Sequence, residues 1–188
     1  MRIISGDYKG KKILLPKDKL TRPLKDLTKE SIFNIIKHSK LLDINLENSN
    51  ILDLFSGVGS FGLECLSRGA VNVTFFESYK EVLAVLKKNI NSLKQQDSSI
   101  IIEKDIFAEN TLSRLNKKFD IIFMDPPYKE KKLVDLLDKI IKLKLLKNNG
   151  TIIIHRHKKE EDIFPSRFNI IMKKNYGISK IIFGNVLG

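Results

Sequence analysis

The pattern of apolar and polar residues from position 50 onward predicts a parallel sheet with crossover helices. Apolar runs that lack alternation are typical of strands covered on both faces, and they alternate here with stretches of helical spacing. The predicted strands are 50–55, 72–77, 99–104, 119–125 and 150–157, and the predicted helices are 60–69, 79–96, 108–116 and 131–147. This order predicts a doubly wound α/β fold.

The two ends of the chain follow other patterns. Residues 168–184 predict two strands around a turn at 175–177, which gives the mostly parallel sheet a C-terminal antiparallel hairpin. Near the start, residues 2–5 and 11–16 predict a small hairpin, and 26–39 predict a helix capped by Asp26 or Thr28. We therefore expect a small basic N-terminal extension (1–49) that binds RNA, and one compact core (50–188).

The composition indicates a folded protein without a membrane partner. The chain has 188 residues, of which 42% are hydrophobic and 30% charged, and no apolar run reaches the roughly 20 residues of a membrane span. The first residues turn charged before a signal-peptide core can form, so we expect a cytoplasmic monomer. Cys65 is the single cysteine, and we expect it to be a buried hydrophobic residue.

The net charge of +12 favours a polyanionic partner, most simply nucleic acid. A chain rich in Lys, Ile and Asn is also typical of A/T-rich codon usage, so charge alone does not identify the partner. Basic residues crowd the first thirty positions, where we expect contacts to RNA phosphates from Lys9, Lys11, Lys12, Arg22, Lys25 and Lys29. For His155 and His157 the sequence shows no acidic partner, and we expect neither chemistry nor a metal site there. His38, near the end of a predicted helix, is expected to interact favourably with the helix dipole.

A glycine-rich turn follows the first core strand. Gly57, Gly59 and Gly62 form a G-x-G-x-x-G pattern, which allows a tight turn and a close approach of the backbone to a nucleotide. Glu77 follows twenty residues after Gly57, at the position of a carboxylate that holds both hydroxyls of a ribose. A nicotinamide dinucleotide and S-adenosylmethionine both fit these features.

Asp53, just ahead of the turn, favours S-adenosylmethionine. A carboxylate at this point repels a pyrophosphate but attracts the sulfonium and ammonium groups of the methyl donor. Alternatively, Asp53 is a structural group that caps amides of the loop. With a ligand free of phosphate, Gly62 is expected to serve packing of the helix on the sheet.

The run Asp125, Pro126, Pro127 and Tyr128 closes a later strand and suits an exocyclic amine of a base. Asp125 and prolyl carbonyls, expected as free acceptors, meet the two N–H groups, and Tyr128 stacks on the ring. Hydrogen bonds from both N–H groups direct the nitrogen lone pair at the methyl group, so positioning supplies the rate and no metal is needed. The alternative is a rigid strand-to-helix turn without chemistry.

The sequence resembles a known family. "DLFSGVGSFGLE" with "DPPY" looks like the Rossmann-like methyltransferases that modify exocyclic amines of nucleic-acid bases. "RIISGDYKGKKILLP", "TRPLKDLTKESIFNII" and "YGISKIIFG" narrow this to the bacterial 16S rRNA guanine-N2 methyltransferase family, whose class I fold the predicted elements match. Leu24, Leu27 and Thr28 depart from the family pattern around the first helix, which weakens any specific phosphate contact assigned to that helix.

The resemblance implies roles for individual residues. Asp53, Phe55, Gly57 and Gly59 line the methionine and ribose side of the cofactor. Glu77, with Ser78 beside it, holds the ribose hydroxyls, and Asp105 with the Ile106 amide meets the adenine edge. The implied activity is methyl transfer to N2 of a guanine in 16S rRNA, free or within a small-subunit particle.

Three other functions remain open at this point. An adenine-N6 methyltransferase on RNA or DNA uses the same Asp-Pro-Pro-Tyr chemistry. A non-catalytic RNA-binding or ribosome-assembly factor keeps the fold alone, although the retained acidic residues argue against it. A nicotinamide oxidoreductase is disfavoured by Asp53 and by the Asp-Pro-Pro-Tyr run.

Overall fold

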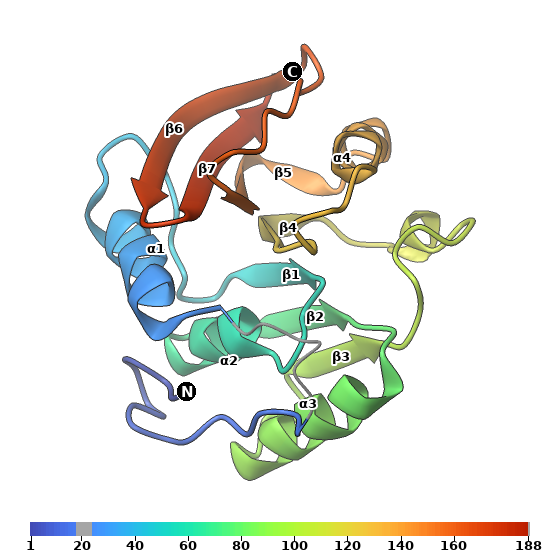
Figure 1. Cartoon of the computed structure of the whole chain (residues 1–188). Helices are drawn as coiled ribbons and strands as arrows, with labels where there is room; N and C mark the ends of the chain where they lie inside the picture. Colours follow the sequence, from blue (N-terminus) through green and yellow to red (C-terminus); the bar gives the residue numbers. More distant parts are fainter. Residues whose placement is uncertain (18–23, 188) are drawn as a thin grey trace.

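One seven-stranded sheet runs through the computed structural model, which describes residues 1–17 and 24–187 (Figure 1). The described strands are β1 (Asn50–Leu54), β2 (Asn72–Phe76), β3 (Ser99–Ile102), β4 (Phe119–Met124), β5 (Leu146–His157), β6 (Phe168–Tyr176) and β7 (Ser179–Val186). Their order is β3-β2-β1-β4-β5-β7-β6, in which β1 to β5 are parallel and β7 is antiparallel to β5 and β6. This confirms the predicted fold class.

Helices cover both faces of the sheet. Apolar residues of three helices share a core with one face: α1 (Asp26–His38), α2 (Ser60–Ser67) and α3 (Lys80–Ser92). The other face packs on α4 (Leu133–Lys142) and a single 3₁₀ turn, η1 (Leu112–Arg114). Within β1, Ile51 faces the first core and Leu52 the second, as the twofold repeat of a strand requires. No helix of the described residues is long and apolar enough to cross a membrane.

Helix boundaries differ from the predicted ones for local reasons. Lys25 precedes α1 without a side-chain cap, so the expected cap by Asp26 or Thr28 is wrong. The helix predicted to reach residue 147 ends at Lys142, because Lys144 adopts a left-handed backbone (φ 53°) and β5 begins at Leu146. The helix predicted at 108–116 is reduced to the η1 turn.

The predicted N-terminal hairpin forms a short antiparallel pairing. Arg2 and Lys12 form a β-bridge, and beside it the amide of Ile3 donates to the carbonyl of Lys11 at 2.9 Å and that of Ile13 to the carbonyl of Met1 at 3.1 Å. The amides of Ile4 and Ser5 instead donate to the carboxylate of Glu64, at 2.8 and 3.0 Å. A side chain of α2 therefore accepts bonds that a partner strand would otherwise accept, and the segment lies beside α2 in Figure 1.

The first 49 residues share the core of the sheet. Ile3, Ile13 and Phe33 belong to the same buried apolar cluster as Ile51 and Phe123. A ring stack continues this contact, since Phe61 of α2 lies between Phe33 (5.2 Å between centroids) and Phe123 (4.0 Å). The described residues of the N-terminal region are thus packed as part of the same core as the sheet.

Lys29 is buried within α1 and does not face solvent. Its side chain is 0% exposed, its Nζ donates to the carbonyl of Arg2 at 2.8 Å, and Glu64 lies 3.5 Å away. Burial lowers the pKa of Lys29, while the charges of Glu64 and Asp26 oppose that shift. The predicted RNA contact at Lys29 is therefore wrong, because no phosphate reaches this ammonium group.

Candidate active site

Three loops meet at the carboxyl edge of the sheet. Leu54 pairs with Phe76 of β2 and with Met124 of β4, so the residues that follow these strands emerge side by side. The amide of Asp125 lies 3.5 Å from the carbonyl of Leu54. The structure thus brings together the glycine loop after β1, Glu77 after β2 and the Asp125–Tyr128 run after β4.

The glycine loop has an unusual backbone. Gly57 (φ 57°) and Gly59 (φ 85°) are left-handed, as predicted for a tight turn, and the amide of Gly59 donates to the carbonyl of Ser56 at 2.8 Å. Phe55 is also left-handed (φ 61°), which is rare for a bulky side chain and common at functional loops. Its ring lies 5.9 Å from that of Phe107, a contact that sequence reasoning missed.

Gly62 serves packing, as expected. A Cβ atom there would lie 2.3 Å from Cε1 of Phe75 and 2.8 Å from Cγ1 of Val73, both on β2. Its amide donates to Oδ2 of Asp53 at 3.0 Å. The third glycine of the pattern therefore lets α2 approach the sheet and offers no free amide to a phosphate.

Asp53 is 1% exposed, and its Oδ2 accepts a hydrogen bond from the amide of Gly62. The alternative role of capping backbone amides therefore applies to at least this oxygen. Burial raises the pKa of Asp53 well above its ordinary value, and the charges of Asp125 and Glu77 raise it further, against the Gly62 hydrogen bond. The charges of Asp125 and Glu77 therefore repel a negative charge on Asp53 at this edge of the sheet. A cation bound among them relieves that repulsion, whereas a pyrophosphate increases it.

Glu77 joins two loops through backbone amides. Its Oε2 accepts from Gly57 at 2.8 Å, and its Oε1 accepts from Ser78 (2.8 Å) and Tyr79 (2.9 Å). A carboxylate has about four lone-pair sites, so three are in use and capacity for a hydroxyl donor remains. The residue predicted to hold a ribose thus also fixes the shape of the glycine loop.

The loop after β3 carries the two residues assigned to the adenine edge. Asp105 is exposed, and its Oδ1 accepts from the amide of Phe107 at 2.9 Å. Ile106 is 5% exposed and belongs to the core beneath. The loop is thereby held with Phe107 against Phe55 of the glycine loop.

Asp125 has an acidic–imidazole partnership that the sequence did not reveal. Its Oδ1 lies 2.7 Å from Nδ1 of His155, and Nε2 of His155 lies 2.9 Å from Oγ of Ser179. The expectation that the histidines have no acidic partner is wrong for His155. One signal was available, because Asp125 and His155 each follow directly after an apolar strand run, and β4 and β5 are adjacent with Met124 opposite Ile154.

Tyr128 and Pro127 of the Asp-Pro-Pro-Tyr run also interact with neighbouring residues. Tyr128 is half-buried, and its ring meets the rings of His157 (5.2 Å) and His155 (6.2 Å) edge-on. The carbonyl of Pro127 accepts from the amide of Glu130 at 2.9 Å. The expectation of two free prolyl carbonyls is therefore wrong for Pro127, because the turn itself uses that acceptor.

A pocket of about 590 Å³ lies beside Tyr128 and is bordered by Arg156, which is 2% exposed. Arg156 donates to both carboxylate oxygens of Asp162, at 3.0 and 2.9 Å, and to the carbonyl of Glu130 at 3.3 Å. These bonds tie the segment between β5 and β6 to the Tyr128 loop. Sequence reasoning did not find Arg156.

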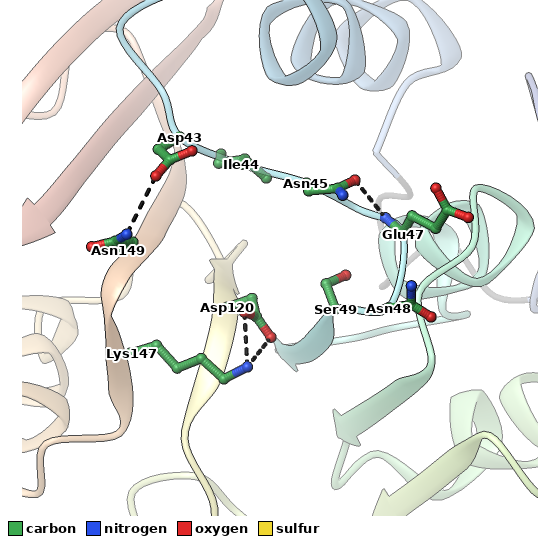
Figure 2. Close-up of a pocket in the computed structure, with 9 residues that line it drawn as sticks. All are labelled: Asp43, Ile44, Asn45, Glu47, Asn48, Ser49, Asp120, Lys147 and Asn149. Atoms are coloured by element: carbon green, nitrogen blue, oxygen red, sulfur yellow. Dashed lines mark hydrogen bonds and ion pairs between the residues drawn. The ribbon is translucent and has the colours of Figure 1, made fainter.

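A second pocket, of about 270 Å³, lies at the opposite edge of the sheet (Figure 2). Asp120 and Lys147, at the amino ends of β4 and β5, form an ion pair of 2.9 Å in it, and Asp43 and Asn149 are joined by a 3.3 Å hydrogen bond. It is remote from the three loops. Within the described residues, no group of three His, Cys, Asp or Glu side chains is arranged to hold a metal ion.

The predicted RNA-binding lysines that are exposed lie on the N-terminal segment and just before α1. Lys9, Lys11, Lys12 and Lys25 are exposed, while Arg22 lies outside the described residues. The turn that carries Lys9 is fixed at the end of α2, where the amide of Tyr8 donates to Oγ of Ser67 at 3.0 Å. Farther along, Leu14 and Val58 are bound by the same Asn89 side chain, so the segment reaches the glycine loop.

Comparison with known proteins places these features in a family. The family model described as conserved hypothetical protein 95 matches residues 1–185. Ribosomal RNA small subunit methyltransferase D of Buchnera aphidicola (Baizongia pistaciae) is 34% identical over 96% of this chain and 88% of its own. The protein of that name from Haemophilus influenzae is 31% identical over 95% and 90%. The solved structure of yhhF from Escherichia coli superposes with a TM-score of 0.82 at 25% identity, over 99% of this chain and 97% of that chain.

Proposed function

The chain belongs to the conserved hypothetical protein 95 family, and on that premise we propose that it methylates N2 of a guanine in small-subunit rRNA. The methyl donor is S-adenosylmethionine. Relatives at 31 to 34% identity are named small-subunit rRNA methyltransferases, which supports the reaction class and the RNA substrate. The Asp125 loop supports transfer to an exocyclic amine of a base, and the choice of guanine N2 comes from the family resemblance alone.

One observation carries the proposal: the amine-binding loop and the cofactor loop adjoin. Asp125 follows β4 directly, and its amide lies 3.5 Å from the Leu54 carbonyl at the start of the glycine loop. A base held by Asp125 and Tyr128 therefore lies next to a ligand held by Gly57, Gly59 and Glu77. Placing two reactants side by side is the main source of rate for a direct transfer.

The residues present fit the methyl donor. Burial is the main cause of the raised pKa of Asp53, and the charges of Asp125 and Glu77 add to it. A sulfonium with an ammonium beside Asp53 would offset these charges. Glu77 has acceptor capacity left for a ribose hydroxyl, with Ser78 beside it. The rings of Phe55 and Phe107 supply an apolar wall, and Asp105 and the Ile106 amide supply polar groups for an adenine edge.

The chemistry of the chain's own residues is positioning. When bound, S-adenosylmethionine supplies an electrophilic methyl group on sulfur. Asp125 and the Pro126 carbonyl accept the two N–H bonds of the base amine, and Tyr128 stacks on the base. These acceptors turn the nitrogen lone pair toward the methyl carbon, in line with the bond to sulfur.

The exposed lysines of the N-terminal segment hold the RNA. Lys9, Lys11 and Lys12 of the N-terminal segment and Lys25 before α1 provide exposed positive charge, and Arg22 adds a further charge in the sequence. A guanine N2 within a duplex is out of reach of the Asp125 loop, so the target base is unpaired or flipped out.

The test is to supply labelled S-adenosylmethionine with small-subunit rRNA, naked and in partly assembled particles, and to map the methyl group. We expect a mark on N2 of a guanine. A mark on N6 of an adenine contradicts the guanine assignment and supports the adenine-N6 alternative. If calorimetry detects no binding of S-adenosylmethionine, the protein is a non-catalytic RNA-binding factor.

A further inference from the structure

We propose that His155 is a positioning residue that fixes the orientation and protonation of Asp125. The inference rests on the proposed function, because the orientation of Asp125 affects the rate of methyl transfer only if Asp125 binds the amine. It adds to that function a residue that neither the sequence motifs nor the family resemblance had identified. His155 acts through Asp125 and does not contact the base.

The geometry places one buried imidazole between two partners. His155 lies on β5, next to β4, and its Nδ1 is 2.7 Å from Oδ1 of Asp125. On its other side, Nε2 is 2.9 Å from Oγ of Ser179, the first residue of β7. The side chain of His155 is 8% exposed and that of Asp125 is 20% exposed. The imidazole is therefore buried, while part of the Asp125 carboxylate remains accessible to a ligand.

The short distance determines where the protons lie. Two lone pairs at 2.7 Å repel, so a proton must lie between Nδ1 and the carboxylate. The neutral imidazole then carries its proton on Nδ1, and its Nε2 accepts from the hydroxyl of Ser179. This arrangement engages Oδ1 of Asp125 and leaves Oδ2 as the acceptor for the amine.

The methyl transfer uses that free oxygen. A bond forms between the base nitrogen and the methyl carbon, the bond from carbon to sulfur breaks, and its electron pair stays on the sulfur. The nitrogen becomes positive and loses one proton to Oδ2 of Asp125. His155 keeps Asp125 rotated so that Oδ2 meets this N–H in the reactive geometry.

Ionisation of His155 gives the proposal a pH signature. A second proton on the ring places a cation beside Asp125, which weakens the carboxylate as an acceptor for both the amine and its proton. Other titratable groups near the pair are Asp53, whose charge interacts with that of Asp125, and Tyr128 and His157, whose rings contact each other. None of these forms a hydrogen bond to the ring of His155 in the described structure, so an acid limb of kcat that disappears when the imidazole is replaced would come from His155.

Two substitutions test the contributions of the two ring nitrogens of His155 separately. In His155→Asn the amide nitrogen takes the place of Nδ1 and still donates to Asp125. In His155→Gln the amide nitrogen takes the place of Nε2, so Ser179 keeps a neighbour and Asp125 loses its donor. We expect kcat for total methyl transfer to fall by about 10- to 100-fold in His155→Gln, and by less than about threefold in His155→Asn. Both variants lose the acid limb of the pH profile, because neither side chain titrates.

His157→Gln is the matched control. It removes the other imidazole that meets the ring of Tyr128, two residues along the same strand, but takes no partner from Asp125. Whatever it does to the rate, the acid limb stays in place. Equal kcat values for His155→Asn and His155→Gln, or an acid limb that persists in both, overturn the proposal. If His155→Gln does not fold, as circular dichroism would show, Ser179→Ala replaces it, with an expected fall of about three- to tenfold and a shifted acid limb.

A measurement on the free protein keeps this test separate from that of the proposed function. Nitrogen-15 NMR of the ring is expected to show His155 protonated on Nδ1, a state that Asp125→Ala abolishes because it removes the acceptor. Protonation on Nε2 instead overturns the proposal, even if guanine methylation is confirmed. Conversely, a methyl mark on adenine or a lack of cofactor binding sinks the proposed function and leaves the Nδ1 result intact.

Discussion

Lys29 and Glu64 form an ion pair in which neither side chain has exposed surface, with 3.5 Å between Nζ and Oε2. Glu64 also accepts from the amides of Ile4 and Ser5 and from Nε of Arg68, so one carboxylate joins α1, α2 and the N-terminal segment. Buried charges with this many partners are costly to separate, because each is left in an apolar environment.

Glu64→Gln therefore destabilises the protein by about 3 to 5 kcal/mol, since it leaves the buried Lys29 ammonium with Asp26, 3.9 Å away, as its remaining counter-charge. Urea unfolding measures the change. Asp138→Asn is the control, because it breaks the exposed pair of Asp138 with Lys142 and should cost less than about 1 kcal/mol. Similar losses of unfolding free energy in the two variants would show that the buried ion pair contributes no more to stability than the exposed one.

Asp53→Asn should raise the free energy of unfolding at neutral pH by about 1 kcal/mol while weakening S-adenosylmethionine binding. The pKa of Asp53 is raised above 3.8, so its contribution to stability is present in acid and is lost as pH rises through the folded pKa. Asparagine still accepts from Gly62 but does not ionise. The stability advantage of the variant is thus expected to grow from pH 4 towards neutrality, as urea unfolding at several pH values would measure. A constant difference would contradict this account.

Glu77→Gln should weaken S-adenosylmethionine binding by about 10- to 100-fold in calorimetry. One carboxylate oxygen becomes an NH₂ group that faces backbone N–H donors, so the glycine loop loses its anchor as well as a ribose acceptor. Glu81→Gln, an exposed change in the first turn of α3, is the matched control and should bind like the wild type. Wild-type affinity in Glu77→Gln would exclude this residue from the cofactor site.

Asp125→Ala should reduce methyl transfer by at least about 1,000-fold and change the Kd for S-adenosylmethionine by less than about threefold. The residue lies at the base-binding loop, and its His155 contact is directed away from the glycine turn. Single-turnover assays and calorimetry on the same sample measure the two quantities. A parallel loss of both would make Asp125 a cofactor or folding residue.

The double variant Lys9→Ala/Lys11→Ala should weaken RNA binding, and the slope of log affinity against log salt should fall by roughly 0.7 to 0.9 for each phosphate that is no longer neutralised. Arg22→Ala should act in the same direction and leave S-adenosylmethionine affinity unchanged. Lys142→Ala/Lys144→Ala removes the same charge from the region of α4 and should leave the slope as it is. An equal effect of the two double variants would indicate attraction by net charge alone.

Local sequence patterns predicted the sheet, the glycine turn and the Asp-Pro-Pro-Tyr run, because each depends on residues close together in the chain. The pairing of His155 with Asp125 spans 30 residues and two strands, and it depends on β4 and β5 being neighbours in register. The apolar runs themselves do not determine strand order. Sequence patterns can therefore identify each residue without identifying the pair.

Lys29 shows the opposite case, in which a local signal was present. Lys29, Ile32, Phe33 and Ile36 recur at helical spacing and are all buried in α1, so the lysine lies on the apolar face. The prediction that Lys29 contacts RNA, like the other basic residues near the N-terminus, ignored its position on this apolar face. Its partner Glu64 is likewise a charged residue within an otherwise apolar helix, α2.

The bonds that hold the N-terminal segment have a consequence for protein synthesis. Ile4 is bound by Glu64, 60 residues later in the chain, and Leu14 is bound by Asn89, 75 residues later. The lysines proposed to bind RNA are thus translated first but cannot take their final arrangement until α2 and α3 have left the ribosome. A nascent or truncated chain lacks the ordered basic surface, so tight RNA binding should appear only when the domain is nearly complete.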